Sequence, residues 1–385
     1  MKEPSLGSIE GFGKKLVEAF RSKNTEFLMA HIPANVVLTD GSDRQAIRRK
    51  INGLFHQLSV IEGKLVEIAK SGDLEYSVKI ILTLTDVEQK FVDDSIYIFV
   101  ETQGPKFEIF DICDDFDLKL KNALNVLKSY SDYSNDPLEN FPGFSYTAAS
   151  DTNSRELRER FHLNEVANGG DEVSRIINLM KWVHCNLKYD GNSEDPSPRN
   201  TFNIIETCQK QDRGVNCRMH ATVLSEVYQS VGLKSRFITC LPEEEKVEEC
   251  HVITEVFSEE LDKWVYMDPS FEAYFVDNQG ILLRVEEVRK KLVSGDSIRV
   301  NEGININNEP YAGGTSKYIK YMTKNFVRFE CLLYNGFESE SDGRRSYIRL
   351  NPKGHSLASK PVIETSERFT IYNTCNPDVF WQKPE

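Results

Sequence analysis

The sequence lacks the features that mark several large classes of protein. No run of about 18 apolar residues is present, so no transmembrane span is expected. Residues 1–8 lack the apolar core of a signal peptide, and we expect a cytoplasmic protein as the chain stands. The alternative is an exported protein whose signal was removed before residue 1. Basic residues are outnumbered, and the net charge of −13 repels phosphate backbones, so no nucleic-acid partner is expected.

Cysteines are also sparse and lack the spacing of structural sites. The chain has 8 cysteines in 385 residues and no Cys-x-x-Cys pair, which argues against a disulfide scaffold and a zinc ribbon. A zinc site can be drawn from Cys208, Cys217, Cys240 and His251, but its spacing matches no established ligand pattern. We therefore predict neither a metal nor an organic cofactor.

The N-terminal part has the apolar pattern of a small α+β domain. Its periodicity predicts helices and then strands, at residues 8–31 and 43–59, and at 64–70, 74–85, 90–101 and 106–112. Helices followed by an antiparallel meander indicate a sheet that is covered on one face. This element order resembles the NTF2-like (cystatin-like) fold. We assign residues 1–118 to an accessory domain with a structural or partner-binding role, since no catalytic constellation occurs there.

The rest of the chain divides into three further segments. We expect a connecting helix and linker at 119–150, a core at 151–300, and a β-rich extension packed on that core at 301–385. In the core the periodicity predicts helices and strands, at residues 153–167, 171–187 and 217–231, and at 234–241, 250–257 and 263–267. The whole protein is therefore predicted to be of the α+β class.

Three short motifs in this core suggest thiol chemistry. Gly214 allows a tight turn before Cys217, which begins a predicted helix, and the positive end of a helix dipole favours thiolate. The free N–H groups of that helix end can also bind a developing oxyanion. His251 lies early in one predicted strand, and Asp268 ends the next. If these strands pair antiparallel, the imidazole can accept the thiol proton while the carboxylate orients the ring.

Other residues near these motifs are candidates for substrate contacts. Asn216 and Gln211 flank the thiol and are candidate oxyanion or substrate contacts, although a turn role for Asn216 and plain exposure of Gln211 fit equally well. Trp182 is a candidate wall of the site or an ordinary core residue. His220, three residues after Cys217, is a rival general base or a packed core residue. Arg218 either lowers the thiol pKa or pairs with surface acids.

The ordered motifs resemble the transglutaminase-like superfamily, whose core is papain-like. The resemblance rests on Gly-x-x-Cys opening a helix, on His251 in a strand and on Trp264-x-x-x-Asp268-Pro. It is closest to uncharacterised bacterial transglutaminase-like proteins, covers residues 150–300 and extends through Tyr318–Phe329 to 372–381. The resemblance implies that Cys217 is the nucleophile, His251 the general base and acid, and Asp268 the orienting residue.

The predicted function is hydrolysis of a peptide or amide bond by this thiol. The expected partner is a peptide, a protein or a small amide that serves as substrate. Two alternatives stay open at this point. One is a non-catalytic binding or scaffold protein with a vestigial site, because a fold does not fix a function. The other is an acyl transferase that cross-links proteins. Substrate identity and oligomeric state are left open by the sequence.

Overall fold

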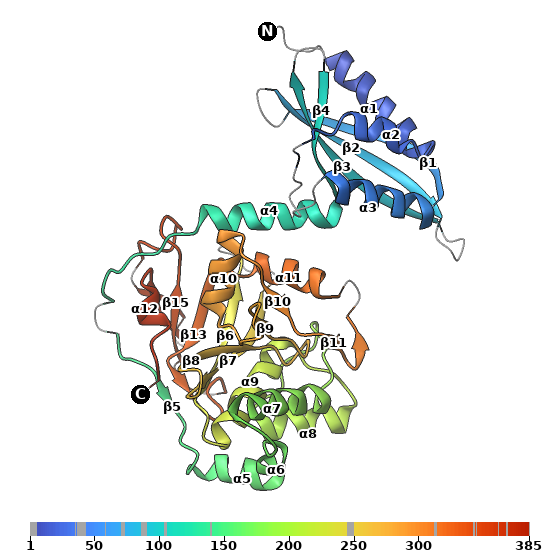
Figure 1. Ribbon diagram of the computed structural model, residues 1–385. Helices are drawn as coiled ribbons and strands as arrows, with labels where there is room; N and C mark the ends of the chain where they lie inside the picture. Colours follow the sequence, from blue (N-terminus) through green and yellow to red (C-terminus); the bar gives the residue numbers. More distant parts are fainter. Residues whose placement is uncertain are drawn as a thin grey trace. The chain divides into compact units, whose positions relative to one another are not determined.

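The computed structural model divides the chain into two units, Met1–Asn122 and Ala123–Glu385. Figure 1 shows the elements of each unit, which are described separately. The structure describes residues 6–34, 36, 44–57, 59–70, 74–85, 91–103, 106–138, 141–244, 250–311, 314–341, 343, 345–360, 362–366 and 369–384. No helix in these ranges has both the length and the apolarity that crossing a bilayer requires.

The N-terminal unit packs helices on one face of a four-stranded sheet. Its elements are α1 (Leu6–Arg21), α2 (Thr25–Ala30), α3 (Arg44–Gln57), β1 (Ser59–Lys70), β2 (Glu75–Thr85), β3 (Phe91–Gln103) and β4 (Lys106–Asp114). The strands form an antiparallel meander in the order β1-β2-β3-β4 (Figure 1). The connecting segments 71–73, 86–90 and 104–105 lie outside the described residues.

Alternating burial along the strands explains why this sheet forms. Val78, Ile80 and Leu82 of β2 are fully buried, whereas the residues between them are partly exposed. Side chains two apart share a face of a strand, so this pattern gives the sheet one apolar face. Helix α1 contributes Leu16 and Phe20 to the same core. The predicted helices-then-meander order is therefore what the structure has.

The helix predicted at 8–31 is two helices. Lys23 has a positive φ of 53°, and α1 ends before it. Asn24 then caps α2, because its side chain accepts a hydrogen bond from the Phe27 amide at 2.9 Å. Apolar periodicity continues across the break, which is why the pattern alone indicated a single helix.

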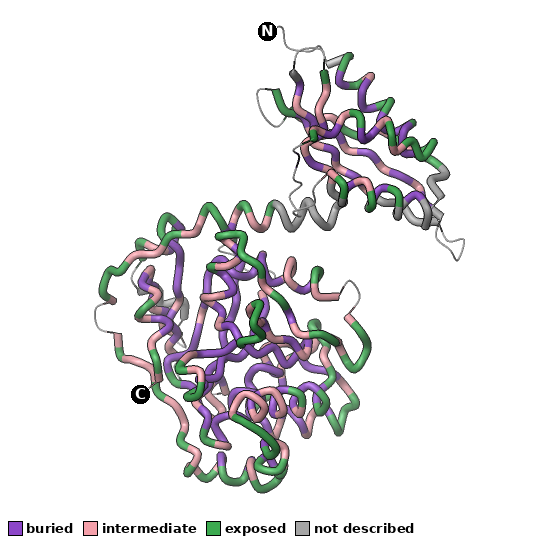
Figure 2. Tube along the Cα trace, viewed as in Figure 1, coloured by how far each residue is buried: buried purple, intermediate pink, exposed green. Residues whose placement is uncertain are grey.

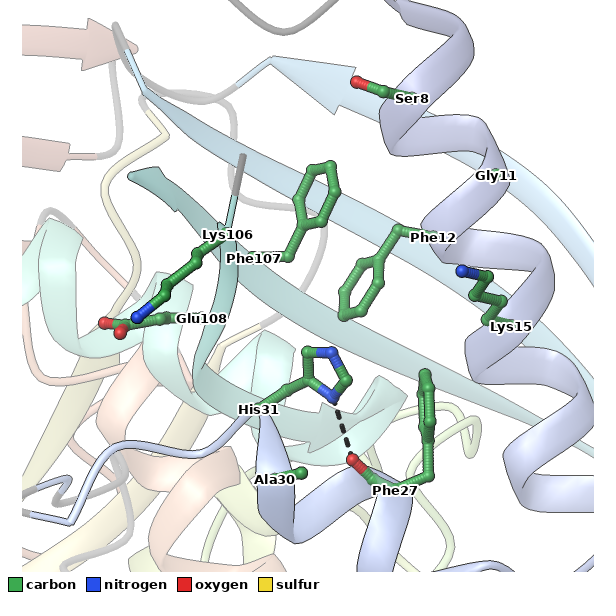
Figure 3. Close-up of a pocket in the computed structure, with 10 residues that line it drawn as sticks. All are labelled: Ser8, Gly11, Phe12, Lys15, Phe27, Ala30, His31, Lys106, Phe107 and Glu108. Atoms are coloured by element: carbon green, nitrogen blue, oxygen red, sulfur yellow. Dashed lines mark hydrogen bonds between the residues drawn. The ribbon is translucent and has the colours of Figure 1, made fainter. Parts of the chain in front are cut away.

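An aromatic cavity of about 570 Å³ opens between α1, α2 and β4. Figure 3 shows Phe12, Phe27, His31 and Phe107 facing one another across it. Phe12 and Phe107 stack with ring centroids 4.7 Å apart. His31 Nδ1 donates to the Phe27 carbonyl at 2.9 Å, as the dashed line in Figure 3 marks. This cavity belongs to the N-terminal unit alone.

The second unit begins within α4 (Asp115–Ser129) and contains the remaining elements. Its helices are α5 (Thr152–Arg160), α6 (Leu163–Val166), α7 (Glu172–Asn186), α8 (Thr201–Gln211), α9 (Cys217–Ser230), α10 (Val285–Ser294), α11 (Gly314–Lys324) and α12 (Pro377–Phe380). Its main strands are β6 (Ser235–Leu241), β7 (His251–Ser258), β8 (Lys263–Met267), β13 (Arg328–Leu332), β15 (Arg345–Leu350), β16 (Val362–Ser366) and β17 (Phe369–Thr374). Short two-residue pairs complete it, namely β5 (Ser145–Tyr146), β9 (Phe275–Val276), β10 (Arg299–Val300), β11 (Asn305–Ile306), β12 (Glu309–Pro310) and β14 (Tyr334–Asn335).

A seven-stranded sheet is the centre of this unit, in the order β16-β17-β15-β13-β6-β7-β8. Helices α7, α8 and α9 cover one side, and α10 and α11 lie on the other (Figure 1). Every residue of β6 and β7 is buried (Figure 2), because helices cover both faces of these strands. The sheet therefore holds β7 and its neighbours in fixed register.

The C-terminal segment 301–385 contributes strands to this sheet. Strand β13 pairs antiparallel with β6, with Cys331 opposite Ile238, and carries β15 and β17 beyond it. The linker also joins the unit, because Ser145 donates its amide to the Leu333 carbonyl at 2.9 Å and Ser134 donates to the Cys375 carbonyl at 2.9 Å. The predicted β-rich extension thus supplies about half of the central sheet.

Candidate active site

The thiol of Cys217 lies at the first residue of α9. Asn216 caps this helix, its side-chain oxygen accepting the Met219 amide at 3.2 Å. Helix geometry leaves the N–H groups of Cys217 and Arg218 without an intrahelical acceptor. Gly214 is needed because a Cβ there would come within 2.7 Å of the Asp190 side chain. The close approach of two backbone segments therefore fixes the turn into the helix.

Strands β7 and β8 bring His251 and Asp268 together. They pair antiparallel, with Thr254 opposite Met267, so the start of β7 and the residue after β8 meet at one end of the sheet. His251 Nε2 lies 2.6 Å from Asp268 Oδ2. Both side chains are fully buried, whereas Cys217 is half-buried. The thiol is thus the accessible member of the group.

The hydrogen bond to Asp268 fixes which ring nitrogen faces the thiol. A carboxylate oxygen can only accept, so Nε2 carries the proton and donates it to Asp268. Nδ1 is buried and makes no hydrogen bond of ordinary geometry within the described residues. The Cys217 thiol lies within interaction distance of His251, because the imidazole lowers the pKa of that thiol, and Nδ1 is the ring nitrogen that Asp268 leaves for it. The imidazole therefore lies between thiol and carboxylate, with Nδ1 toward the sulfur.

The electrostatics of the three groups favour an ionised thiol. Burial raises the pKa of the Cys217 thiol, but hydrogen bonding to His251 and its charge, the Val252 amide and Arg218 outweigh burial, so the pKa lies below its ordinary value. Burial opposes charging of His251, but the adjacent Asp268 carboxylate dominates and raises the pKa of His251 to about 10. The proton is therefore held more strongly by the imidazole than by the thiol.

Two buried tyrosines extend the hydrogen-bonded group beyond Asp268. The Tyr318 hydroxyl of α11 donates to Asp268 Oδ2 at 2.7 Å, and the Ser270 amide donates to Oδ1 at 2.9 Å. The Tyr266 hydroxyl lies 2.5 Å from that of Tyr318. Neither tyrosine was predicted from the sequence to be a site residue. Helix α11 was not predicted, and no local motif connects Tyr318 with Asp268.

Aromatic rings surround His251 on its other sides. Phe271 and Tyr321 meet its ring edge to face, with centroids 5.5 and 5.3 Å away. Tyr189 packs against Phe271, with centroids 6.1 Å apart, and its phenol feels the charges of Cys217 and Asp268. Burial and these charges raise the pKa of the Tyr189 phenol, so it stays a protonated donor. Low polarity around the imidazole strengthens its interactions with both partners.

The candidate substrate contacts lie in different places. Asn216 is the helix cap, and its amide donates to Asp195 Oδ1 at 2.5 Å. Gln211, at the end of α8, is exposed and accepts from Arg213 Nε at 2.9 Å. Trp182 packs against Phe161, with centroids 5.5 Å apart, in the helical layer. These contacts match the turn, exposed and core alternatives, while a substrate or oxyanion role for Asn216 and Gln211 and a wall role for Trp182 stay predictions.

His220 and Arg218, both on α9, lie in different surroundings. His220 is fully buried, and burial lowers its pKa to about 4. Its Nε2 lies 3.3 Å from the Lys188 carbonyl, in the helix-packed interior. Arg218 donates to Glu340 Oε1 at 2.9 Å and to Thr239 Oγ1 at 3.0 Å. Arg218 therefore pairs with a buried acid, and its charge also lowers the thiol pKa.

Comparisons with known proteins concern the two units separately. A domain of unknown function with a cystatin-like fold from Nostoc punctiforme is 13% identical, over 32% of this chain and 85% of that one, with a TM-score of 0.24. A DUF4783 family protein from Bacteroides ovatus is 18% identical, over 26% of this chain and 89% of that one, with a TM-score of 0.22. The N-terminal unit has the element order that was predicted, helices followed by a four-stranded antiparallel meander.

In the second unit, the segment that contains Cys217 matches a known protein family. A search of the curated proteins finds no match. Among protein families, the transglutaminase-like superfamily matches residues 161–269. This segment runs from the start of the helical layer through α9, β6, β7 and β8 to the residue after Asp268. Residues 161–269 therefore form a transglutaminase-like domain.

Proposed function

We propose that the second unit is a thiol hydrolase that cleaves a peptide or amide bond through an acyl-thioester at Cys217. The observation that supports this most is the chain of contacts from Cys217 through His251 to Asp268. A half-buried thiol at a helix N-terminus faces a buried imidazole, and a carboxylate 2.6 Å away orients that imidazole. Such an arrangement activates a nucleophile and provides a proton donor for the leaving group.

The first half of the proposed reaction forms the acyl-thioester. The Cys217 thiolate attacks the substrate carbonyl carbon, a carbon–sulfur bond forms, and the oxygen becomes an oxyanion. The free N–H groups of Cys217 and Arg218 at the start of α9 supply donors for that oxygen. The carbon–nitrogen bond then breaks as the His251 imidazolium gives its Nδ1 proton to the leaving amine. Asp268 retains its negative charge throughout.

The second half of the reaction regenerates the thiolate. Water attacks the thioester carbonyl and gives a proton to His251 Nδ1. The carbon–sulfur bond breaks, the carboxylic acid leaves as product, and the thiolate–imidazolium pair is restored. An amine in place of water would give acyl transfer. We favour hydrolysis because water is the simpler acceptor and needs no second binding site.

The test compares the wild-type protein with Cys217→Ser against a panel of peptides and small amides, including cell-wall amides, by mass spectrometry. Cys185→Ser is the matched control, because Cys185 is exposed on α7. We expect products, and an acyl adduct on Cys217, with the wild type and Cys185→Ser but not with Cys217→Ser. Product formation that persists in Cys217→Ser would refute the proposal. Products that contain an added primary amine would favour the transferase instead.

A non-catalytic role is the second candidate function. If the site is vestigial, Cys217 will react with iodoacetamide no faster than other exposed cysteines near neutral pH. Tight binding of a peptide without turnover, together with such slow labelling, would favour a binding or scaffold protein.

A further inference from the structure

We propose that Tyr318 is a positioning residue that tunes the Cys217–His251 pair through Asp268, with Tyr266 behind it. This inference rests on the proposed function and deepens it. Tyr318 comes from α11, outside the segment 161–269 that matches the transglutaminase-like superfamily. The candidate triad would then be completed by a side chain from the C-terminal part of the chain.

The position of the Asp268 carboxylate is fixed by donors on both of its oxygens. Oδ1 accepts the Ser270 amide at 2.9 Å, and Oδ2 accepts Tyr318 at 2.7 Å as well as His251 at 2.6 Å. A carboxylate held at both oxygens cannot rotate about its bond without breaking one of these contacts. Asp268 is fully buried, so the loss of a donor leaves a buried carboxylate oxygen with one hydrogen bond fewer, which is costly. Tyr318 therefore helps to set the direction from which Asp268 meets His251.

The direction of the tyrosine hydrogen bonds follows from the donors available. A hydroxyl has one proton, and Tyr318 gives its proton to the carboxylate, which can only accept. The 2.5 Å contact between the tyrosines must then use the proton of Tyr266, donated to the Tyr318 oxygen. Burial raises the pKa of both phenols well above the ordinary value, so both remain protonated at working pH. The chain of donation runs from Tyr266 to Tyr318 to Asp268.

Sharing of Oδ2 predicts how Tyr318 acts on the thiol. Tyr318 and His251 donate to the same oxygen, so each reduces the negative charge that the other meets. Tyr318 therefore keeps Asp268 from stabilising the imidazolium as strongly as it would alone. Without the Tyr318 hydroxyl, the carboxylate should favour the charged imidazole more, and the thiolate–imidazolium pair should form at lower pH. Tyr266 strengthens Tyr318 as a donor and should have a smaller effect of the same sign.

The experiment measures the rate of Cys217 alkylation by iodoacetamide against pH, read by peptide mass spectrometry. Tyr318→Phe keeps the ring and removes the hydroxyl. Tyr228→Phe is the matched control, because Tyr228 is also fully buried and donates to a backbone carbonyl, that of Ile176, at 2.8 Å. We expect the thiol profile of Tyr318→Phe to move toward acid by about half a unit to one unit. That of Tyr266→Phe should move less, and that of Tyr228→Phe should not move.

Two results would overturn this inference. One is a Tyr318→Phe profile that coincides with that of the wild type and Tyr228→Phe, and the other is a profile displaced toward alkali. If Tyr318→Phe does not fold, Tyr266→Phe decides, with an acid displacement in support and an unchanged profile against. The alkylation needs no substrate, so it tests the role of Tyr318 separately from amide cleavage. If the profile moves but the wild type cleaves no amide, the role of Tyr318 stands and the proposed hydrolase function is wrong. If the wild type cleaves an amide but the Tyr318→Phe profile does not move, the hydrolase function stands and the role of Tyr318 is wrong.

Discussion

Removal of the His251 imidazole should slow the reaction of Cys217 more than any other single change outside the thiol itself. His251 is the main group that opposes the effect of burial on the thiol pKa. A hydrogen bond to a charged group contributes about 1.5–3 kcal/mol. At about 1.36 kcal/mol per pKa unit, its loss raises the thiol pKa by about one to two units. At pH 6 the thiolate fraction should then fall roughly 10- to 100-fold in His251→Ala.

The assay is the initial rate of iodoacetamide labelling at pH 6, with each cysteine quantified by mass spectrometry. His162→Ala is the matched control, because this side chain is 73% exposed and lies outside the site. Circular dichroism checks that His251→Ala is folded, and Cys185 serves as the internal standard. If Cys217 in folded His251→Ala is labelled as fast as in the wild type, the assignment of His251 as the thiol's partner is wrong. A slowing confined to His220→Asn would instead identify His220 as the base.

Three further predictions concern stability and the extent of the folding unit. Burial raises the pKa of Glu226 to about 7, so it binds its proton more tightly when folded, and its contribution to stability is lost as pH rises from about 4.5 to about 7. Urea titrations at pH 4.5 and 7.5 measure how much unfolding free energy each protein loses over this range. Glu226→Gln lacks the titrating carboxyl, so its loss should be smaller than that of the wild type by up to about 3 kcal/mol. Glu340→Gln should cost about 3 kcal/mol by the same method, because it removes the buried negative charge that pairs with the Arg218 guanidinium. A fragment of residues 161–269 lacks β13, which pairs with β6, and α11, which carries Tyr318. Iodoacetamide should therefore label Cys217 in the fragment no faster than a free cysteine, and a labelling rate equal to that of the wild type would contradict this.

The candidate triad could be predicted because its chemistry lies in short, ordered motifs. Cys217 opens a helix, His251 begins β7, and Asp268 directly follows β8, the next strand in sequence, so local patterns were enough to bring them together. Antiparallel pairing of such strands is the simplest connection. The predicted helix N-terminus also indicated a thiolate at Cys217, because the positive end of the helix dipole favours a negative charge.

The surroundings of the triad could not be predicted in the same way. Tyr318 reaches Asp268 only because α11 packs on the face of the sheet that carries Tyr266, and that packing depends on the register of strands far apart in sequence. Gly214 was expected to serve a turn, whereas the structure shows that the backbone beside Asp190 leaves no room for a Cβ. The break at Lys23 was missed because apolar periodicity records which face is buried but not where φ changes sign.

The place of β13 in the central sheet has a consequence for how the protein is made. Chain synthesis runs from the N-terminus, so α9, β6, β7 and β8 emerge from the ribosome before β13 exists. Until Arg328–Leu332 arrives, one edge of β6 has no strand to pair with, and Asp268 lacks the donor that α11 provides. The nascent chain thus carries Cys217 for about 100 to 115 residues before its surroundings are complete. The strand that completes the sheet beside β6 and the donor that completes the hydrogen bonds of Asp268 are therefore both translated after the three residues of the candidate triad.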